Sequence, residues 1–203
     1  LASLDKRPAP SADPEVARRV GDIRFELSRE AQKARWREQI RPEWEAAVPG
    51  ILDLLTHRNP RVRFEALERL GTIEDEDIEV LFKDLLTDRS PRIALKAARL
   101  LYLRGDRAGA EVFRRTLEKG SEAARLEVLQ TLDSRKTRRD RAKDLPLARL
   151  ALKDEGAGVR AFAVRLVTAL GDRQALPELG RSLGDPAAEV RVAAIQSIGN
   201  LGL

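Results

Sequence analysis

The stretches LLTHRNPRV (54–62) and LLTDRSPRI (85–93) decide the fold of this chain, because they are two copies of one sequence repeat. They lie 31 residues apart, and the same spacing separates VRAFAV (159–164) from VRVAAI (190–195). A fixed period of this size is typical of a repeat architecture in which each unit is one supersecondary element. The predicted units begin at Pro49, Val80, Glu111, Pro146 and Pro177.

Apolar residues recur within each unit at the spacing of one helical face. In the second half of a unit, the positions 0, 4, 5 and 8 residues after Val62 or its equivalents are apolar, which predicts an amphipathic helix. One column is mostly alanine, so neighbouring helices can approach closely: Ala66, Ala97, Val128, Ala163 and Ala194. The next column holds Leu67, Ala98, Leu129, Val164 and Ile195. The first half of each unit has a leucine column: Leu55, Leu86, Leu117, Leu152 and Leu183.

Capping residues separate the two helices of a unit. Asn59-Pro60 and Ser90-Pro91 place an N-cap side chain before a proline that opens a helix, and Ser121 keeps the cap without the proline. Each unit is therefore predicted to be a helix–turn–helix. Because no unit can bury its apolar face alone, the units should stack. We predict an all-α solenoid of five helix pairs.

The N-terminal part falls outside the repeat register. Residues 1–13 read as a linker, residues 14–48 as an N-terminal helical cap, and residues 49–203 as the repeat array. In the cap, Val16, Val20, Ile23 and Leu27 share one helical face that should cover the first unit. Trp36 and Trp44 follow, and we expect them to belong to the same cap. The alternative is that the two tryptophans bind a ligand. The chain starts without Met and ends on an apolar helix, so we expect a processed product whose array continues beyond Leu203.

Two further stretches carry a family resemblance. DEGAGVR (154–160) and DPAAEVR (185–191) resemble HEAT repeats, especially the short HEAT-like repeats named after phycobilisome lyases. The resemblance covers about 49–203. It implies that the Asp and Arg of each unit form a hydrogen-bonded ladder along the stack, and it implies little about function. The two pairs that match are Asp154 with Arg160 and Asp185 with Arg191; the other units have His57 with Arg63, Asp88 with Ala94, and Lys119 with Arg125. We therefore expect the ladder to break at the third unit.

Composition excludes several kinds of chemistry. The chain has 203 residues, 42% of them hydrophobic, with no Cys and a single His. Disulfides, zinc–thiolate sites and thiol catalysis are therefore excluded. The sequence shows no glycine-rich phosphate loop and no serine motif with a base. The HEAT-like hydroxylases need repeated His-Glu pairs, which are absent here, and no lyase or glycosylase residues carry over. We expect no catalytic residue, no metal and no cofactor.

The segment DSRKTRRDRAK (133–143) is the first candidate binding site. It lies in the one connection that is four residues longer than the others. Its residues 134–143 carry a charge of +5, which equals the net charge of the whole chain. A solvated connection is the plain alternative. Otherwise these cations would bind an acidic protein, a membrane headgroup or a nucleic-acid backbone. They are Arg135, Lys136, Arg138, Arg139, Arg141 and Lys143.

A polar column on the predicted second helices is the second candidate. It holds Glu68, Arg99, Gln130, Arg165 and Gln196. The resemblance places second helices on the concave side of the solenoid, so this column should form an exposed ridge there. Its mixed polarity suits a protein or peptide better than a uniform polyanion, although any solvated helix face can look like this.

These observations predict a non-catalytic scaffold that binds a protein partner through the concave ridge or the basic edge. A nucleic-acid-backbone binder is the main alternative, and a lyase-like accessory protein is another. Nothing in the sequence is long and apolar enough to span a membrane. Cytoplasm is the default compartment, and a secreted or membrane-tethered chain stays open, as do the partner's identity and the oligomeric state.

Overall fold

The computed structural model describes residues 14–39, 48–73, 78–134 and 143–200. These residues form eleven α-helices and no strand, which confirms the predicted all-α fold. Contacts divide the chain into two compact units, 1–66 and 67–203. The helices are α1 (Pro14–Gln39), α2 (Val48–Leu55), α3 (Pro60–Leu70), α4 (Glu79–Leu85), α5 (Pro91–Leu103), α6 (Ala110–Lys119), α7 (Glu122–Asp133), α8 (Leu145–Leu150), α9 (Ala157–Ala169), α10 (Leu176–Ser182) and α11 (Ala188–Asn200). Short 3₁₀ turns follow α8 and precede α10.

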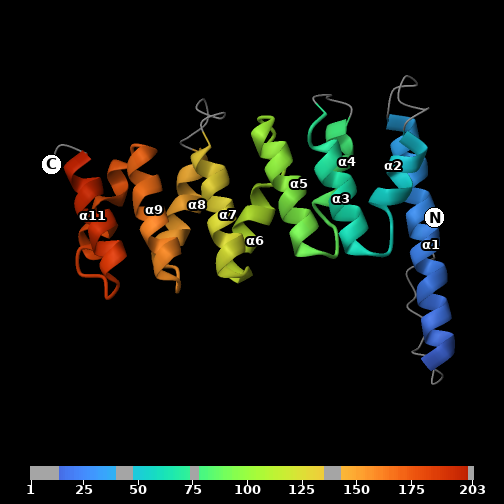
Figure 1. Cartoon of the computed structure of the whole chain (residues 1–203), viewed down its shortest axis with the longest axis horizontal. Helices are drawn as coiled ribbons and strands as arrows, with labels where there is room; N and C mark the ends of the chain where they lie inside the picture. The colour runs from blue at the N-terminus through green and yellow to red at the C-terminus, as the bar shows by residue number, and fades with distance from the viewer. Residues whose placement is uncertain (1–13, 40–47, 74–77, 135–142, 201–203) are drawn as a thin grey trace. The chain divides into compact units, whose positions relative to one another are not determined.

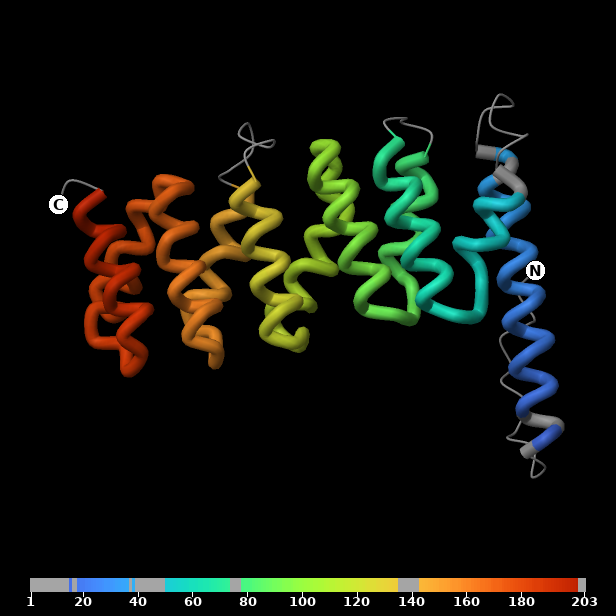
Figure 2. The backbone as a smooth tube through the Cα atoms, in the orientation of Figure 1, coloured from blue at the N-terminus to red at the C-terminus, as the bar shows by residue number. Residues whose placement is uncertain are grey.

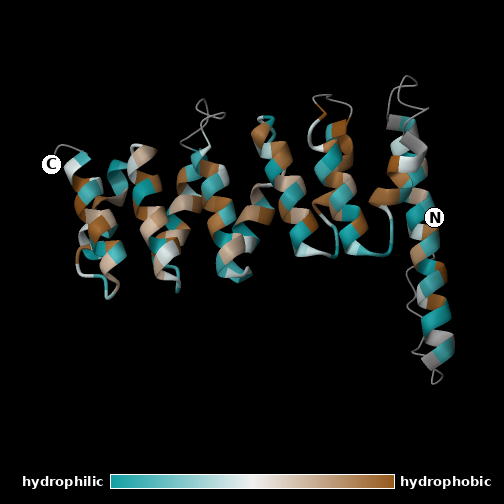
Figure 3. Ribbon diagram, viewed as in Figure 1, coloured by the Kyte–Doolittle hydropathy of each residue, from teal (hydrophilic) through white to brown (hydrophobic). Residues whose placement is uncertain are grey.

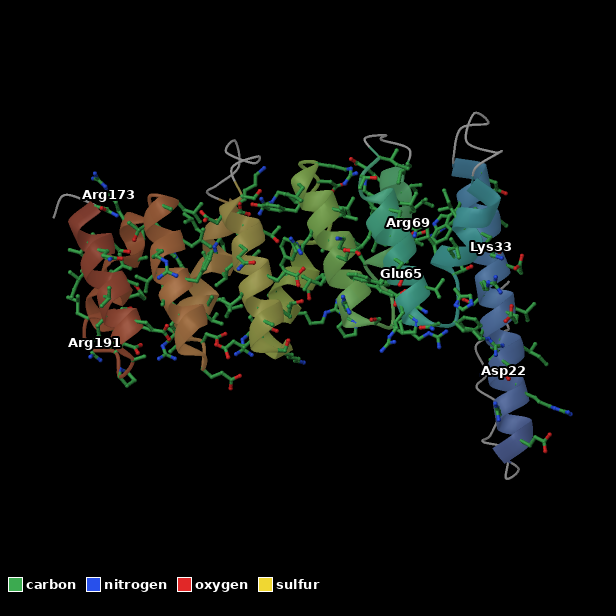
Figure 4. The ribbon with its side chains drawn as sticks, in the orientation of Figure 1. Asp22, Lys33, Glu65, Arg69, Arg173 and Arg191 are labelled. Carbon is green, nitrogen blue, oxygen red and sulfur yellow. The ribbon has the colours of Figure 1, made fainter. Side chains whose placement is uncertain are left out.

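In the first unit, α1 meets α2 through its C-terminal half. Arg29 Nε donates to the Thr56 hydroxyl over 3.0 Å, and Lys33 bonds the Asp53 carboxylate. Trp36, on the same half of α1, has an exposed fraction of 0%. Figure 4 labels Lys33 on this helix. A buried tryptophan is a packing residue, so for Trp36 the ligand-gripping alternative is not supported, whereas Trp44 lies outside the described residues.

The predicted covering face of α1 is exposed in the structure. Val20, Ile23 and Leu27 leave 38%, 60% and 67% of their surface to solvent, and the side chain of Val16 lies outside the described set. The expectation that this stripe covers the first repeat is therefore wrong for these three residues. Helical spacing identifies residues that share a face, but it does not identify what packs on that face.

In the second unit, consecutive helices form antiparallel hairpins that stack in chain order (Figure 1). Each first helix packs on the second helix of its own hairpin, as α4 does on α5 and α10 on α11. Each second helix also contacts the next one, from α5 to α7, α9 and α11. The tube in Figure 2 shows the same order along residues 78–134 and 143–200. Layered hairpins of this kind define an α-solenoid.

One hydrophobic core runs through the second unit. Ala98, Leu129 and Val164 are buried, as are Ala163 and Ala194 of the alanine column. Ile195, the last member of the first of these columns, is exposed. The ring of Tyr102 meets that of Phe113 edge-on at 5.6 Å. Figure 3 shows the resulting alternation of apolar and polar turns along each helix. The apolar columns read from the sequence are therefore the contacts that hold neighbouring hairpins together.

The predicted caps form at two of three positions. Asn59 accepts a hydrogen bond from the backbone N–H of Arg61 over 2.9 Å, and Ser121 accepts one from Ala124. Ser90 makes no side-chain cap, although Pro91 does open α5. The Asp88 carboxylate accepts the backbone N–H of Ser90 over 2.8 Å. An aspartate two residues upstream thus orders this turn in place of the expected serine.

A buried aspartate fixes the start of α8. Asp144, with 0% exposure, accepts a hydrogen bond from the Tyr102 hydroxyl over 2.7 Å. Its other oxygen lies 2.6 Å from the Arg107 guanidinium. A buried carboxylate needs partners of this kind, because an unpaired charge there is costly. Asp144, the residue that follows the basic segment, is therefore held by α5 and by the connection between α5 and α6.

Candidate functional site

An Arg–Asp ladder joins the last hairpins on the turn side. Arg160 on α9 makes two 2.8 Å bonds to the carboxylate of Asp185, through Nε and Nη2. Its third nitrogen, Nη1, bonds the backbone carbonyls of Asp154 and Glu155 in its own turn. Asp185 also accepts the backbone N–H of Ala187 over 2.9 Å. Each arginine thus holds its own turn and the next unit's aspartate at once.

The ladder is broken on only one side of the third unit, the unit at which the sequence predicted a break. Arg125, in the third repeat, donates from Nη2 to Asp154 of the fourth over 3.0 Å and forms an ion pair with it at 2.8 Å, so the third unit keeps its forward link. The link from the second unit to the third lacks both members, because a buried Ala94 replaces the arginine and an exposed Lys119 replaces the aspartate. A donor and its acceptor are therefore missing together, and no charge is left buried without a partner.

Ion pairing shifts the pKa values of the ladder residues. The hydrogen bonds from Arg160 hold the pKa of Asp185 below the usual aspartate value. Bonds of 2.5 Å and 2.6 Å from Arg149 lower the pKa of the buried Asp172 in the same way. These groups stay charged at neutral pH and act as structural links.

The predicted ridge lies on the second helices, and its first two members are held by neighbouring repeats. Glu68 receives a 2.9 Å ion pair from Lys96 of α5. Arg99 pairs with Glu127 of α7. These contacts run between successive second helices and cancel opposite charges. This part of the ridge therefore has a structural role that its sequence column did not reveal.

The remaining three members are open. Gln130, Arg165 and Gln196 are exposed on α7, α9 and α11. The Arg165 guanidinium carbon lies 5.6 Å from the centre of the Phe162 ring, one turn earlier on α9. Within the described residues, none of the three takes part in an inter-repeat hydrogen bond or ion pair. We call Gln130, Phe162, Arg165 and Gln196 the open ridge.

A groove between first helices is a feature that the sequence columns did not indicate. It has a volume of about 510 Å³ and combines apolar Leu117 and Leu150 with charged groups. Its buried charges, Arg125 and Asp154, pair with each other, and Arg149 pairs with Asp172 outside the lining. Lys153 is exposed to solvent, and a single exposed cation does not indicate a ligand site, so we assign the groove no function.

Most of the basic segment lies outside the described residues. This applies to Arg135, Lys136, Arg138, Arg139 and Arg141, so their role stays a prediction. Lys143 is described and exposed, next to the buried Asp144.

The described residues contain no cluster of three or more His, Asp or Glu side chains placed to hold a metal ion. None of the helices in those same ranges has the length and apolar character that crossing a membrane requires.

The stacked hairpins, with buried alanine columns and an Arg–Asp ladder, define a helical-repeat protein. The family model of HEAT repeats matches residues 145–203, which hold the last two hairpins. These residues are therefore similar to HEAT repeats, as the sequence resemblance implied. No curated protein matches the chain.

Proposed function

We propose that this chain is a non-catalytic scaffold that binds a protein partner through the open ridge. HEAT repeats commonly act as protein-interaction scaffolds and are typically non-catalytic, which supports the class of function. The observation that carries the choice of surface is the exposed Arg165, which lies over the half-buried Phe162 ring, together with the exposed Gln130 and Gln196. Arginine and aromatic side chains dominate binding energy at protein interfaces.

The chemistry of the open ridge supports a polypeptide ligand. Glutamine side chains donate and accept hydrogen bonds, so they match the alternating groups of a peptide backbone. Arg165 offers a cation above an aromatic ring, which favours an acidic side chain on the partner. A polyanion would instead require cations along the whole ridge, whereas Glu68 and Glu127 lie on its first half. The open ridge therefore favours a protein over a nucleic acid.

The test compares two triple variants of the full chain. Gln130→Ala, Arg165→Ala and Gln196→Ala remove polar contacts of the open ridge. Arg115→Ala, Lys153→Ala and Arg181→Ala remove three exposed residues of the first-helix side. Partners are captured from native extract after nuclease treatment and quantified by mass spectrometry. The ridge variant should lose partner by at least about tenfold, since one hot-spot residue is worth about 2 kcal/mol.

The control variant should retain the partner at the wild-type level. Equal loss in both variants, or retention in the ridge variant, would remove the open ridge from the account. A parallel capture is made from extract that has not been treated with nuclease. If it recovers only nucleic acid, the result would instead favour the basic segment (133–143) as the binding site. That interaction would weaken steeply with salt, because each neutralised phosphate releases counterions.

A further inference from the structure

The outer side of the last hairpin has the composition of an internal stacking surface. Ile195 is 62% exposed, whereas Leu129 and Val164, which hold the same column in earlier units, are buried. Val192 is 50% exposed, and Leu183 of the first-helix leucine column is 43% exposed. An outermost repeat needs a polar outer face for solubility. This apolar surface therefore resembles a face that receives another hairpin.

Arg191 supplies an independent observation on the same face. Its Nη1 bonds the backbone carbonyls of Asp185 and Pro186, both at 2.9 Å, as Nη1 of Arg160 bonds its own turn. In Arg160 the nitrogens Nε and Nη2 then hold the aspartate of the next unit. In Arg191 those two nitrogens have no partner among the described residues. Figure 4 labels Arg191 at the turn-side end of α11.

We propose that the outer side of the last hairpin binds one more helix hairpin of the same repeat type. We call this surface the α11 face; it is formed by Leu183, Arg191, Val192 and Ile195. The hairpin carries an aspartate in its inter-helix turn and stacks in register as the next repeat. Its apolar stripe covers Val192 and Ile195. Its aspartate accepts two hydrogen bonds from Arg191. This surface is separate from the open ridge, so the inference does not depend on the proposed function.

Arg191 selects this occupant over simpler ones. A bare amphipathic helix would cover the apolar residues but leave a guanidinium beside them without a carboxylate, which is unfavourable. A second copy of this chain, docked through its first hairpin, would bring His57 to the position of the aspartate. A histidine in its neutral form cannot provide the two acceptor atoms that a carboxylate offers to a guanidinium fork.

The experiment extends the full chain with a copy of its own residues 173–203, joined directly after Leu203. This junction keeps the repeat register, because Asp172 and Leu203 occupy equivalent positions in consecutive units. The added hairpin carries a copy of Asp185. Amide hydrogen exchange of α11 and the midpoint of thermal unfolding are measured in the parent and in the extended chain. We expect slower exchange in α11, by at least about tenfold, once the hairpin docks.

A double-mutant cycle isolates the ladder contact. Replacing the copied Asp185 by Asn should lower the midpoint of the extended chain by about 2–4 °C when Arg191 is present. The same replacement should have no effect in the Arg191→Gln background. If the two changes act independently, the aspartate requirement is overturned. If exchange in α11 does not slow, the docking itself is overturned.

Sedimentation velocity of the parent chain tests whether a second copy of the chain occupies the α11 face instead. A monomer that Ile195→Glu leaves monomeric agrees with the proposal. A dimer that Ile195→Glu dissociates would assign the α11 face to a second copy of the chain and overturn the proposal.

Discussion

At the scale of single residues, the ladder converts a recurring Asp and Arg into links between repeats. Arg125 and Asp154 leave only 8% and 6% of their side chains exposed. A buried ion pair adds little net stability over an apolar pair, but removing one partner leaves an uncompensated charge. The neighbouring Glu155 also touches Arg125, at 3.1 Å, yet its side chain is 84% exposed. The two acids therefore differ in burial and share one partner.

We predict that Asp154→Ala lowers the free energy of unfolding by about 3–5 kcal/mol, because Arg125 stays buried without its carboxylate. Glu155→Ala is the matched control and should cost less than about 1 kcal/mol. Urea unfolding followed by circular dichroism measures both. Similar costs for the two variants would show that the ladder pair is not a buried link.

The lowered pKa values of Asp172 and Asp185 predict the direction of the pH dependence. A carboxyl whose pKa is lower in the folded state stabilises the fold above its unfolded pKa of about 4. That contribution is lost as pH falls through the lowered pKa. Stability from these two residues should therefore be complete above about pH 5 and decline in more acidic solution.

The test is a series of urea unfolding curves between about pH 2 and pH 6, bracketing the pKa of aspartate. The double variant Asp172→Asn, Asp185→Asn should show a flatter decline of unfolding free energy on the acid side than the wild type. An unchanged slope would mean that other carboxyl groups cause the acid sensitivity.

At the scale of helices, close approach depends on small residues at the hairpin contacts. Gly109 precedes α6, and a Cβ built there would lie 2.5 Å from Cβ of Ala98 on α5. Gly180 lies inside α10, where a Cβ would have no neighbour within 4 Å. The same substitution should therefore have opposite effects at these two positions.

Gly109→Ala should lower the free energy of unfolding by about 1–3 kcal/mol, because α5 and α6 must separate. Gly180→Ala should raise it by about 0.5–1 kcal/mol, because alanine favours the helix. The urea midpoints of the two variants measure the difference. Destabilisation by Gly180→Ala would contradict the open surroundings assigned to α10.

Sequence reasoning succeeded where the signal is local and failed where it depends on distant partners. The apolar columns predicted the core, because the spacing of apolar residues along one helix is visible in a short stretch of sequence. The exposure of Ile23 and Leu27 was missed, because spacing does not show what covers a face. The forward link of Arg125 was also missed, because its acceptor Asp154 lies in the next repeat. Likewise, only the structure shows that Arg99 is paired with Glu127.

At the scale of the whole molecule, the repeats of 67–203 form a chain of nearest-neighbour contacts. Within this unit α7 contacts α9, and α9 contacts α11. In such an array, stability is a sum of repeat terms and interface terms, so a local defect has local effects. A compact globule, in which distant helices pack on one another, would instead lose stability everywhere at once. The open ridge relies on this arrangement, because α7, α9 and α11 each contribute to it.

Native-state hydrogen exchange of the Asp154→Ala variant, resolved by helix, tests this stacking most directly. We predict that amide exchange accelerates most in α7 and α9, on either side of the broken ladder link, and progressively less in α5 and α4. Equal acceleration in every helix of 67–203 would contradict the account, because it would show one cooperative globule in place of a stack of repeats.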